Sequence, residues 1–275
     1  MGNLFKAFLF KLKRDLTFRI TLFIGLGFAI LMTLIYFFID MALVNNPHLP
    51  EGIKLCTGSN LLITSFSPTQ NYGLVVPVNL VSFTVLEFTQ GTIRNKIIAG
   101  NSKAKIYVSL FISGIVFTIL LMGSYALLCL GLGSIFGGFD PNGMTMAGIG
   151  FGKMSVDYIW KMIVMSLAIY IFISSMTIFF ATLFRNIGPC IPVVILLIVA
   201  LYMIASLLPE LVEESVDVLR IVDPLYGLNA ASIDSSTQSL HVENVDFIAC
   251  IINNLVLSVS FFVGGIIIFK HRDVK

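Results

Sequence analysis

The sequence has little charge: Asp, Glu, Lys and Arg make up 12% of its 275 residues, against about 25% in soluble domains. Its hydrophobic fraction is 57% and its mean hydropathy is +0.97. A soluble fold of this length could not bury so much apolar surface, whereas lipid solvates the outer faces of helices in a bilayer. The net charge of +2 is small and predicts no nucleic-acid partner.

Motifs for nucleotide binding and catalysis are also missing. No G-x-x-x-x-G-K-[ST] loop occurs, so we do not expect the chain to bind ATP through a P-loop, and neither H-E-x-x-H nor G-x-S-x-G occurs. The three histidines stand in predicted loops, and the four cysteines show no C-x-x-C spacing. We therefore expect no enzyme activity, no catalytic residue, no metal site and no cofactor on this chain.

Long uncharged runs indicate membrane-spanning helices, each of which needs about 20 residues. The second span is harder to place, because the uncharged run 55–86 holds a polar cluster, 67–72, in its middle. A lipid-facing helix would not put that cluster at mid-depth, so the span is placed after it, with a re-entrant segment before Tyr72 as the alternative. The predicted fold class is all-α, with six transmembrane helices in a single domain, 1–275, at about 20–39, 72–88, 106–136, 162–184, 187–208 and 247–269.

An amphipathic helix is predicted before the first span, over residues 4–16. Apolar residues recur there at helical spacing, and the basic residues between them are Lys6, Lys11, Lys13 and Arg14. The pattern suits a helix in the inner membrane interface, with its cations on lipid phosphates. A plain charged flank on the first span is the alternative. No small-residue cleavage site follows, so we expect the run 20–39 to be retained as a span.

The distribution of charge predicts the orientation of the chain. With both termini in the cytoplasm, 13 of the 17 basic residues fall in cytoplasmic segments and 12 of the 15 acidic residues fall outside. Short cytoplasmic loops of membrane proteins carry this excess of Lys and Arg. We therefore expect a multi-pass protein of the plasma membrane with both termini cytoplasmic.

The cytoplasmic loop 89–105 is the most distinctive segment. Two glycines bracket the stretch TIRNKIIA, which is long enough for two helical turns with an apolar face and a basic rim. Such a helix would suit either the docking of a partner or contact with lipid headgroups. Glu87, just before it, is either an interfacial carboxylate or a partner for the loop's cations. The residues predicted to dock are Gly91, Thr92, Ile93, Arg94, Lys96, Ile97 and Ile98.

Two segments carry a resemblance to a known family. Residues 87–100 read EFTQGTIRNKIIAG and residues 223–229 read DPLYGLN, close to a D-P-x-x-x-x-N pattern. With six spans, cytoplasmic termini and the N-terminal helix, the chain resembles the permease subunits of ABC-2 type exporters. The resemblance implies cytoplasmic ABC ATPase subunits as partners, which hold the ATP and Mg, and a coupling helix at about Gly91–Ala99. Many relatives have a proline near the end of that helix, where this chain has Gly100-Asn101-Ser102.

Within that family the chain is most similar to Firmicute exporters of peptides and antimicrobial peptides, such as the phenol-soluble modulin exporter. The similarity implies export of amphipathic or hydrophobic cargo. It also implies that two permeases pair to form the exporter, either as a homodimer or as two related chains. The second and fifth spans would line the pathway. On that mapping the lining residues are Asn79, Ser82, Phe83 and Thr84, although ordinary helix packing would suit the same residues.

The acidic segment 209–246 would close the outer end of the pathway if the resemblance holds. Apolar residues recur there near helical spacing among four acidic ones, which indicates an amphipathic helix over the outer mouth. An acidic, solvated loop is the alternative. The predicted gate residues are Leu211, Val212, Val216 and Leu219.

Two other classes of protein compete with an exporter permease. One is a membrane immunity or structural protein without a motor, and the other is a membrane-embedded enzyme. An enzyme would need a cluster of catalytic or metal-binding residues at one depth, and the sequence offers none.

Overall fold

The computed structural model describes residues 10, 12, 14, 16–44, 54–69, 72–147, 150–211, 216–229, 231–233 and 238–271. The helices are α2 (Leu16–Val44), α3 (Gly58–Phe66), α4 (Tyr72–Thr89), α5 (Thr92–Ile98), α6 (Lys103–Gly137), α7 (Val156–Phe184), α8 (Ile187–Leu211), α9 (Val216–Val222), α10 (Tyr226–Asn229) and α11 (Asn244–His271). Four short strands are β1 (Met144–Ala147), β2 (Gly150–Lys153), β3 (Ser232–Ile233) and β4 (Leu240–His241).

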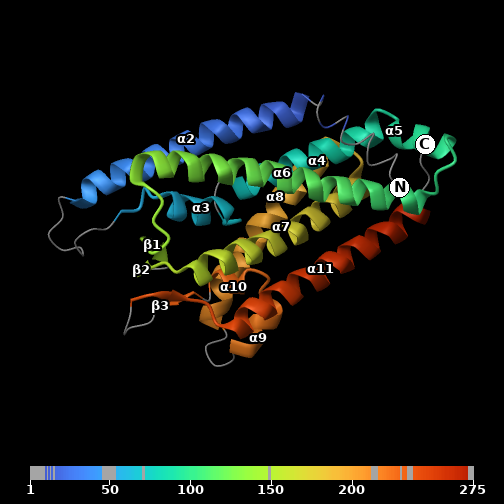
Figure 1. Ribbon diagram of the computed structural model, residues 1–275. Helices are drawn as coiled ribbons and strands as arrows, with labels where there is room; N and C mark the ends of the chain where they lie inside the picture. Colours follow the sequence, from blue (N-terminus) through green and yellow to red (C-terminus); the bar gives the residue numbers. More distant parts are fainter. Residues whose placement is uncertain are drawn as a thin grey trace.

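The all-α membrane class is confirmed. Five helices, α2, α6, α7, α8 and α11, are long and apolar enough to cross a bilayer, and α4 with α5 adds a sixth if that bent pair is one span. Among the described residues, the strands form two antiparallel pairs, β1–β2 and β3–β4. All four strands lie with α9 and α10 at one end of the elongated bundle, called here the hairpin end, and α5 lies at the other, the α5 end (Figure 1).

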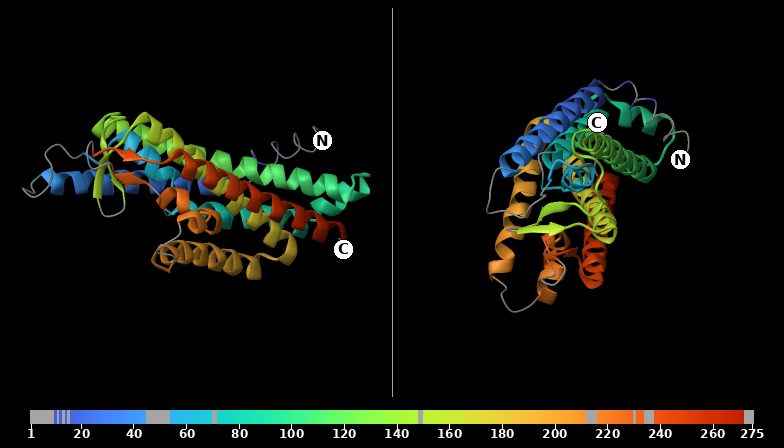
Figure 2. Two further views of the ribbon diagram at one scale, coloured as in Figure 1. Left: turned by 90° about the horizontal axis from the view of Figure 1, so that it is seen from below. Right: turned by 60° about the vertical axis from the view of Figure 1, so that its left-hand side comes forward.

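α7 is the central helix of the bundle, and it contacts α4, α6, α8 and α11. Most of its apolar length is buried, whereas α2, α8 and α11 are largely exposed and lie at the periphery (Figure 2). Their exposed side chains are large and apolar, as with Phe23, Leu196 and Val256. Surfaces of this kind are stable when lipid, and not water, covers them.

The segment before α4 is expected from the sequence to lie outside the second span, but the structure places it within the bundle. α3 is almost wholly buried against α6, and along α6 it lies beside Gly133. α4 meets the same helix further along, where Phe83 stacks on Phe117 with ring centroids 5.0 Å apart. α3 and α4 therefore follow one another along α6, and the polar break between them lies within the bundle (Figure 1).

Hydrogen bonds fix the break between α3 and α4. The hydroxyl of Tyr202, inside α8, donates to the carbonyl oxygen of Pro68. A side chain at Gly73 would overlap that carbonyl, so only glycine fits there. Polar groups at this depth are tolerated because neighbouring helices supply their partners. Hydropathy alone does not reveal such partners, and it therefore predicts that the polar cluster lies at the outer end of the span.

Glycines on α6 allow α3 to approach closely. A Cβ at Gly137 would overlap the carbonyl oxygen of Cys56, and a Cβ at Gly133 would lie 2.7 Å from a methyl group of Leu61. The chain entering α3 is also held by Asp40 at the end of α2, whose carboxylate accepts from the backbone amide of Cys56 at 2.7 Å. Small residues four apart permit this kind of contact between membrane helices.

We expect Gly137→Ala to destabilise the protein by roughly 2 kcal/mol, because the new methyl group meets backbone that cannot rotate away. Gly131→Ala on the same helix is the matched control, since nothing lies within 4 Å of its Cβ position. That control should be neutral or slightly stabilising, because alanine favours helix by up to about 1 kcal/mol. Thermal unfolding in detergent would compare the two, and equal midpoints would contradict the close contact.

Candidate functional site

The candidate docking site is α5, which follows α4 at an angle of 50°. Gly91 has φ of 67° and Gly100 has φ of 84°, and nothing lies within 4 Å of either Cβ position. These glycines are therefore required by backbone conformation and not by space. They end α4 and α5 sharply, so that seven of the eight residues between them form a separate short helix at the α5 end of the bundle (Figure 1).

The isoleucines of α5 do not share one face, which corrects the expected apolar docking surface. Ile93 is 1% exposed and belongs to the core formed with α2, α4 and α6, and Ile97 packs against the same core. Ile98 is 74% exposed. Two of the three apolar residues thus anchor α5 to its own chain, because a helix of seven residues needs tertiary contacts to be stable.

Glu87 and Lys96 form an ion pair that holds α5 against α4. The ammonium of Lys96 lies 2.8 Å from the carboxylate of Glu87, which is buried at the end of α4 next to α5. Of the two interpretations of Glu87, the one in which it holds the loop through a cation agrees with this geometry. A buried carboxylate of this kind depends on its partner, because an uncompensated buried charge is costly.

What α5 presents outward is mainly polar. Arg94 and Asn95 are exposed, and Ile98 lies one turn further along the same side of the helix. These three residues are called the exposed α5 face. Thr92 is half-buried at the start of the helix. An apolar side chain beside a guanidinium is a combination that protein interfaces favour.

The connection between α7 and α8 lies close to the same end of α4. Arg185, with φ of 52°, ends α7, and its guanidinium lies 5.4 Å from the ring centroid of Phe88. Phe88 in turn contacts Phe269 of α11 with ring centroids 6.1 Å apart. The end of α4 next to α5 therefore contacts α5, α7 and α11.

The predicted pathway residues lie on α4 but not on one open surface. Asn79 is half-buried and accepts from the hydroxyl of Thr21 on α2 at 2.8 Å. Ser82 is half-buried, with its hydroxyl bonded back to the carbonyl of Val78 at 3.3 Å. Phe83 and Thr84 are buried inside the chain's own bundle. Helix packing accounts for Phe83, which stacks on α6, and only Asn79 and Ser82 keep partial exposure.

The predicted gate is divided between two helices. Leu211 ends α8, Val216 begins α9, and Val212 lies outside the described residues. Leu219 is buried on α9 toward α10 and α11, whereas Ile221 is 73% exposed. The helical nature of this segment agrees with the prediction in part, but its apolar residues point both inward and outward.

Little of the predicted N-terminal helix can be compared with the structure. Lys6, Lys11 and Lys13 lie outside the described residues. Arg14 lies over the ring of Phe10, 4.4 Å from its centroid. Leu12 is buried in the core that also holds Ile93, so this segment contacts the bundle as well as any lipid.

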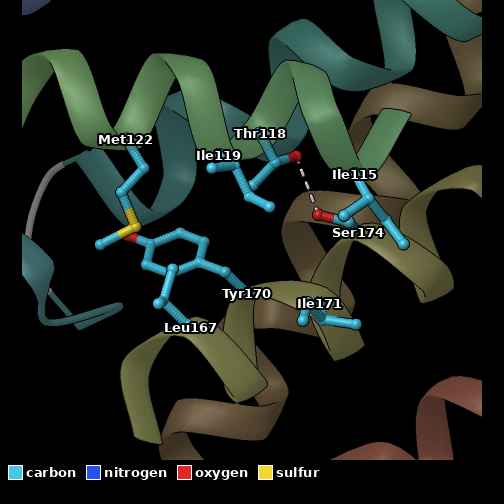
Figure 3. A pocket seen from close by; sticks show the side chains of 8 residues that line it. All are labelled: Ile115, Thr118, Ile119, Met122, Leu167, Tyr170, Ile171 and Ser174. Carbon is cyan, nitrogen blue, oxygen red and sulfur yellow. Dashed lines mark hydrogen bonds between the residues drawn. The ribbon is translucent and has the colours of Figure 1, made fainter. Parts of the chain in front are cut away.

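A small crevice lies between α6 and α7. Thr118 and Ser174 share a hydrogen bond of 2.9 Å at its wall, and Tyr170 and Met122 lie beside them (Figure 3). Its volume of about 10 Å³ is that of a single water molecule. The crevice is therefore too small to hold a peptide or lipid.

A buried polar cluster at the hairpin end was not found from the sequence. Arg220 of α9 pairs with Asp246 of α11, and the amide of Asn254 donates to the carbonyl of Pro224 at 2.8 Å. Asp223 accepts from the backbone amide of Leu225 at 2.8 Å. The available signal was an asparagine within an otherwise apolar span, which usually marks a polar partner.

Comparison with known proteins identifies a family but no function. A family model described as "Protein of unknown function (DUF2705)" matches residues 28–275, which include α3 to α11 and the exposed α5 face. No curated protein matches the chain. The match covers most of the sequence, and the chain therefore belongs to the DUF2705 family.

Proposed function

We propose that this chain is the transmembrane permease subunit of an ATP-driven ABC exporter, with α5 as the helix that docks on a cytoplasmic ATPase. The observation that carries the proposal is the way in which α5 is attached to the bundle. Ile93 and the Lys96–Glu87 pair fix the helix to the bundle, while Arg94 and Ile98 point away from it. A helix fixed on one side and exposed on the other can pass force from a partner into the bundle.

The energy for transport would come from another subunit. The sequence has no phosphate-binding loop, so ATP and Mg would be bound by the ATPase. The connection between α7 and α8 at this end is only Arg185 and Asn186, too short to form a docking surface. α5 offers the larger contact, with the N-terminal segment around Arg14 in support.

The positive charge at the α5 end supports an orientation with this end in the cytoplasm. Five basic residues near that end are Arg94, Lys96, Lys103, Lys105 and Lys270. Lys103 and Lys270 lie side by side, because the ammonium of the first donates to the carbonyl of the second at 3.3 Å. On the positive-inside rule, both termini are cytoplasmic and the protein resides in the plasma membrane.

We propose that the cargo is amphipathic or hydrophobic, such as a peptide, and that two permease copies form the pathway. The largely apolar exposed surfaces of α2 and α8 support a partner or cargo of low polarity. The half-buried Asn79 and Ser82 on α4 would add a few polar contacts. Leu219 and the rest of α9 would then cover the outer end of the pathway.

Purification of the tagged chain from its native membranes tests this function. We expect an ABC ATPase to co-purify, and deletion of either gene to abolish export of the same amphipathic peptides. A membrane immunity or structural protein would be isolated without an ATPase, and its deletion would leave export unchanged. That result would reject the permease assignment.

A further inference from the structure

Two buried oxygen atoms at the hairpin end have no hydrogen-bond partner among the described residues. They are Oδ2 of Asp223, in a residue that is 2% exposed, and Oδ1 of Asn254, in a residue that is 0% exposed. A buried polar atom left unpaired costs about 1–3 kcal/mol. Both atoms accept hydrogen bonds when Asp223 is ionised, so neither could satisfy the other in that state.

Asn254 and the residue after Asp223 form one contact between the segment 223–229 and α11. The amide nitrogen of Asn254 donates to the carbonyl of Pro224, the residue directly after Asp223. The other carboxylate oxygen of Asp223 accepts from the amide of Leu225. Gly227 of α10 lies on Cys250, one turn before Asn254, so closely that a Cβ there would overlap the cysteine's Cβ. α10 is therefore docked on α11 around an uncompensated carboxyl group.

The cations near this contact already have partners. Arg220 of α9 is bonded to Asp246 and lies 3.4 Å from Glu243. Lys161 of α7 donates to the carbonyl of Val242 at 2.9 Å and pairs with Asp157 at 2.8 Å. The remaining titratable groups around the contact are Tyr226 of α10 and Cys250 of α11. Burial raises the pKa of Asp223 from its ordinary value of 3.8.

We propose that Asp223 is a proton-binding site: its buried carboxyl group is neutral while α10 is docked, and loss of the proton places a charge in this buried contact and releases α9 and α10 from α11. The contribution of Asp223 to docking is then fully present below pH 3.8, the ordinary pKa of the carboxyl group. It weakens as pH rises from that value through the raised pKa, because the docked state binds the proton more tightly than the released state. The site is independent of what the chain transports.

Cys250 provides a native reporter of release. It is 3% exposed and covered by Gly227. The test uses a full-length chain that retains only this cysteine, and the same chain with Asp223→Asn. For each chain, the rate of thiol labelling at about pH 8 is divided by the rate at about pH 5. We expect this ratio to be at least tenfold larger in the chain with Asp223. The asparagine variant keeps the shape and a hydrogen-bond donor but cannot ionise. The measurement uses purified protein in detergent, where the thiol reagent reaches both ends of the bundle. The result therefore does not depend on the orientation of the chain in a membrane.

The comparison separates the proposal from its rivals. If ionised Asp223 acted only through its charge, it would slow the labelling of Cys250, which is the opposite of the expected acceleration. A water molecule that donated to both oxygens would leave docking independent of pH, and the two chains would then label alike. Equal labelling, or faster labelling of the asparagine variant, would overturn the proton site. Protection by sodium at fixed pH would assign the site to a cation and would also overturn it.

Discussion

A variant that carries Arg94→Glu and Ile98→Asp is expected to retain about 100-fold less ATPase on purification than the wild-type chain. Both side chains belong to the exposed α5 face, so the substitutions reach a partner without entering the core. Reversing a charge and removing an apolar anchor at a small interface together cost about 3 kcal/mol. Each 1.4 kcal/mol corresponds to about a tenfold change in affinity.

The matched control is Ala104→Asp with Lys105→Glu. Both residues are exposed at the start of α6, at the same end of the bundle, and the change in formal charge is the same. This control should keep most of its ATPase. Both variants should insert and unfold thermally like the wild type, since none of the four side chains is buried. If the α5 variant still retains its ATPase and still exports, docking occurs elsewhere.

The second large effect is expected for Lys96→Met, which should lower the free energy needed to release α5 from the bundle by about 2 kcal/mol. Glu87 is buried, and losing the cation that lies 2.8 Å from its carboxylate weakens the compensation of that charge; breaking a fully buried pair costs about 3–5 kcal/mol. We take the lower figure because Lys96 is a quarter exposed. Trypsin cleavage after Arg94 in detergent would measure the opening, since proteolysis follows the population of the open form. Cleavage should accelerate roughly 30-fold.

The double variant Glu87→Met with Lys96→Met is the control for this effect. Replacing a buried ion pair by apolar residues of similar size is often neutral or stabilising. The double variant should therefore recover most of the resistance to trypsin, although the single variant Lys96→Met does not. Equal cleavage of the single variant and the wild type would show that the pair contributes nothing to the position of α5.

The contacts of α5 indicate how movement of an ATPase would be transmitted to the bundle. α5 is joined to α4 by the buried Ile93 and by the pair between Lys96 and Glu87. α4 contacts α2, α6, α7 and α8, and Arg185 over Phe88 adds a contact at the end of α4 next to α5. A displacement of α5 would therefore move a helix that contacts four others, and not an isolated loop.

The sequence determined the membrane class and the approximate spans of this chain. Long runs without charge cannot be solvated by water, and this follows from composition whatever the neighbours are. The two glycines around residues 92–98 likewise predicted a separate helix, because their left-handed backbone conformation is a local property. Both features depend only on the chain and its solvent.

Which side of each helix is covered was decided by the tertiary structure. Ile93 and Ile98 are the same residue type on the same helix, yet one is buried and the other is exposed. The polar break at Pro68 lies within the bundle because Tyr202, far away in sequence, donates to it. Pro224 and Asn254 are brought together by the docking of α10 on α11. Hydropathy reports the contact of a segment with water or lipid, whereas these features depend on which helix lies beside it, and no local pattern encodes that neighbour.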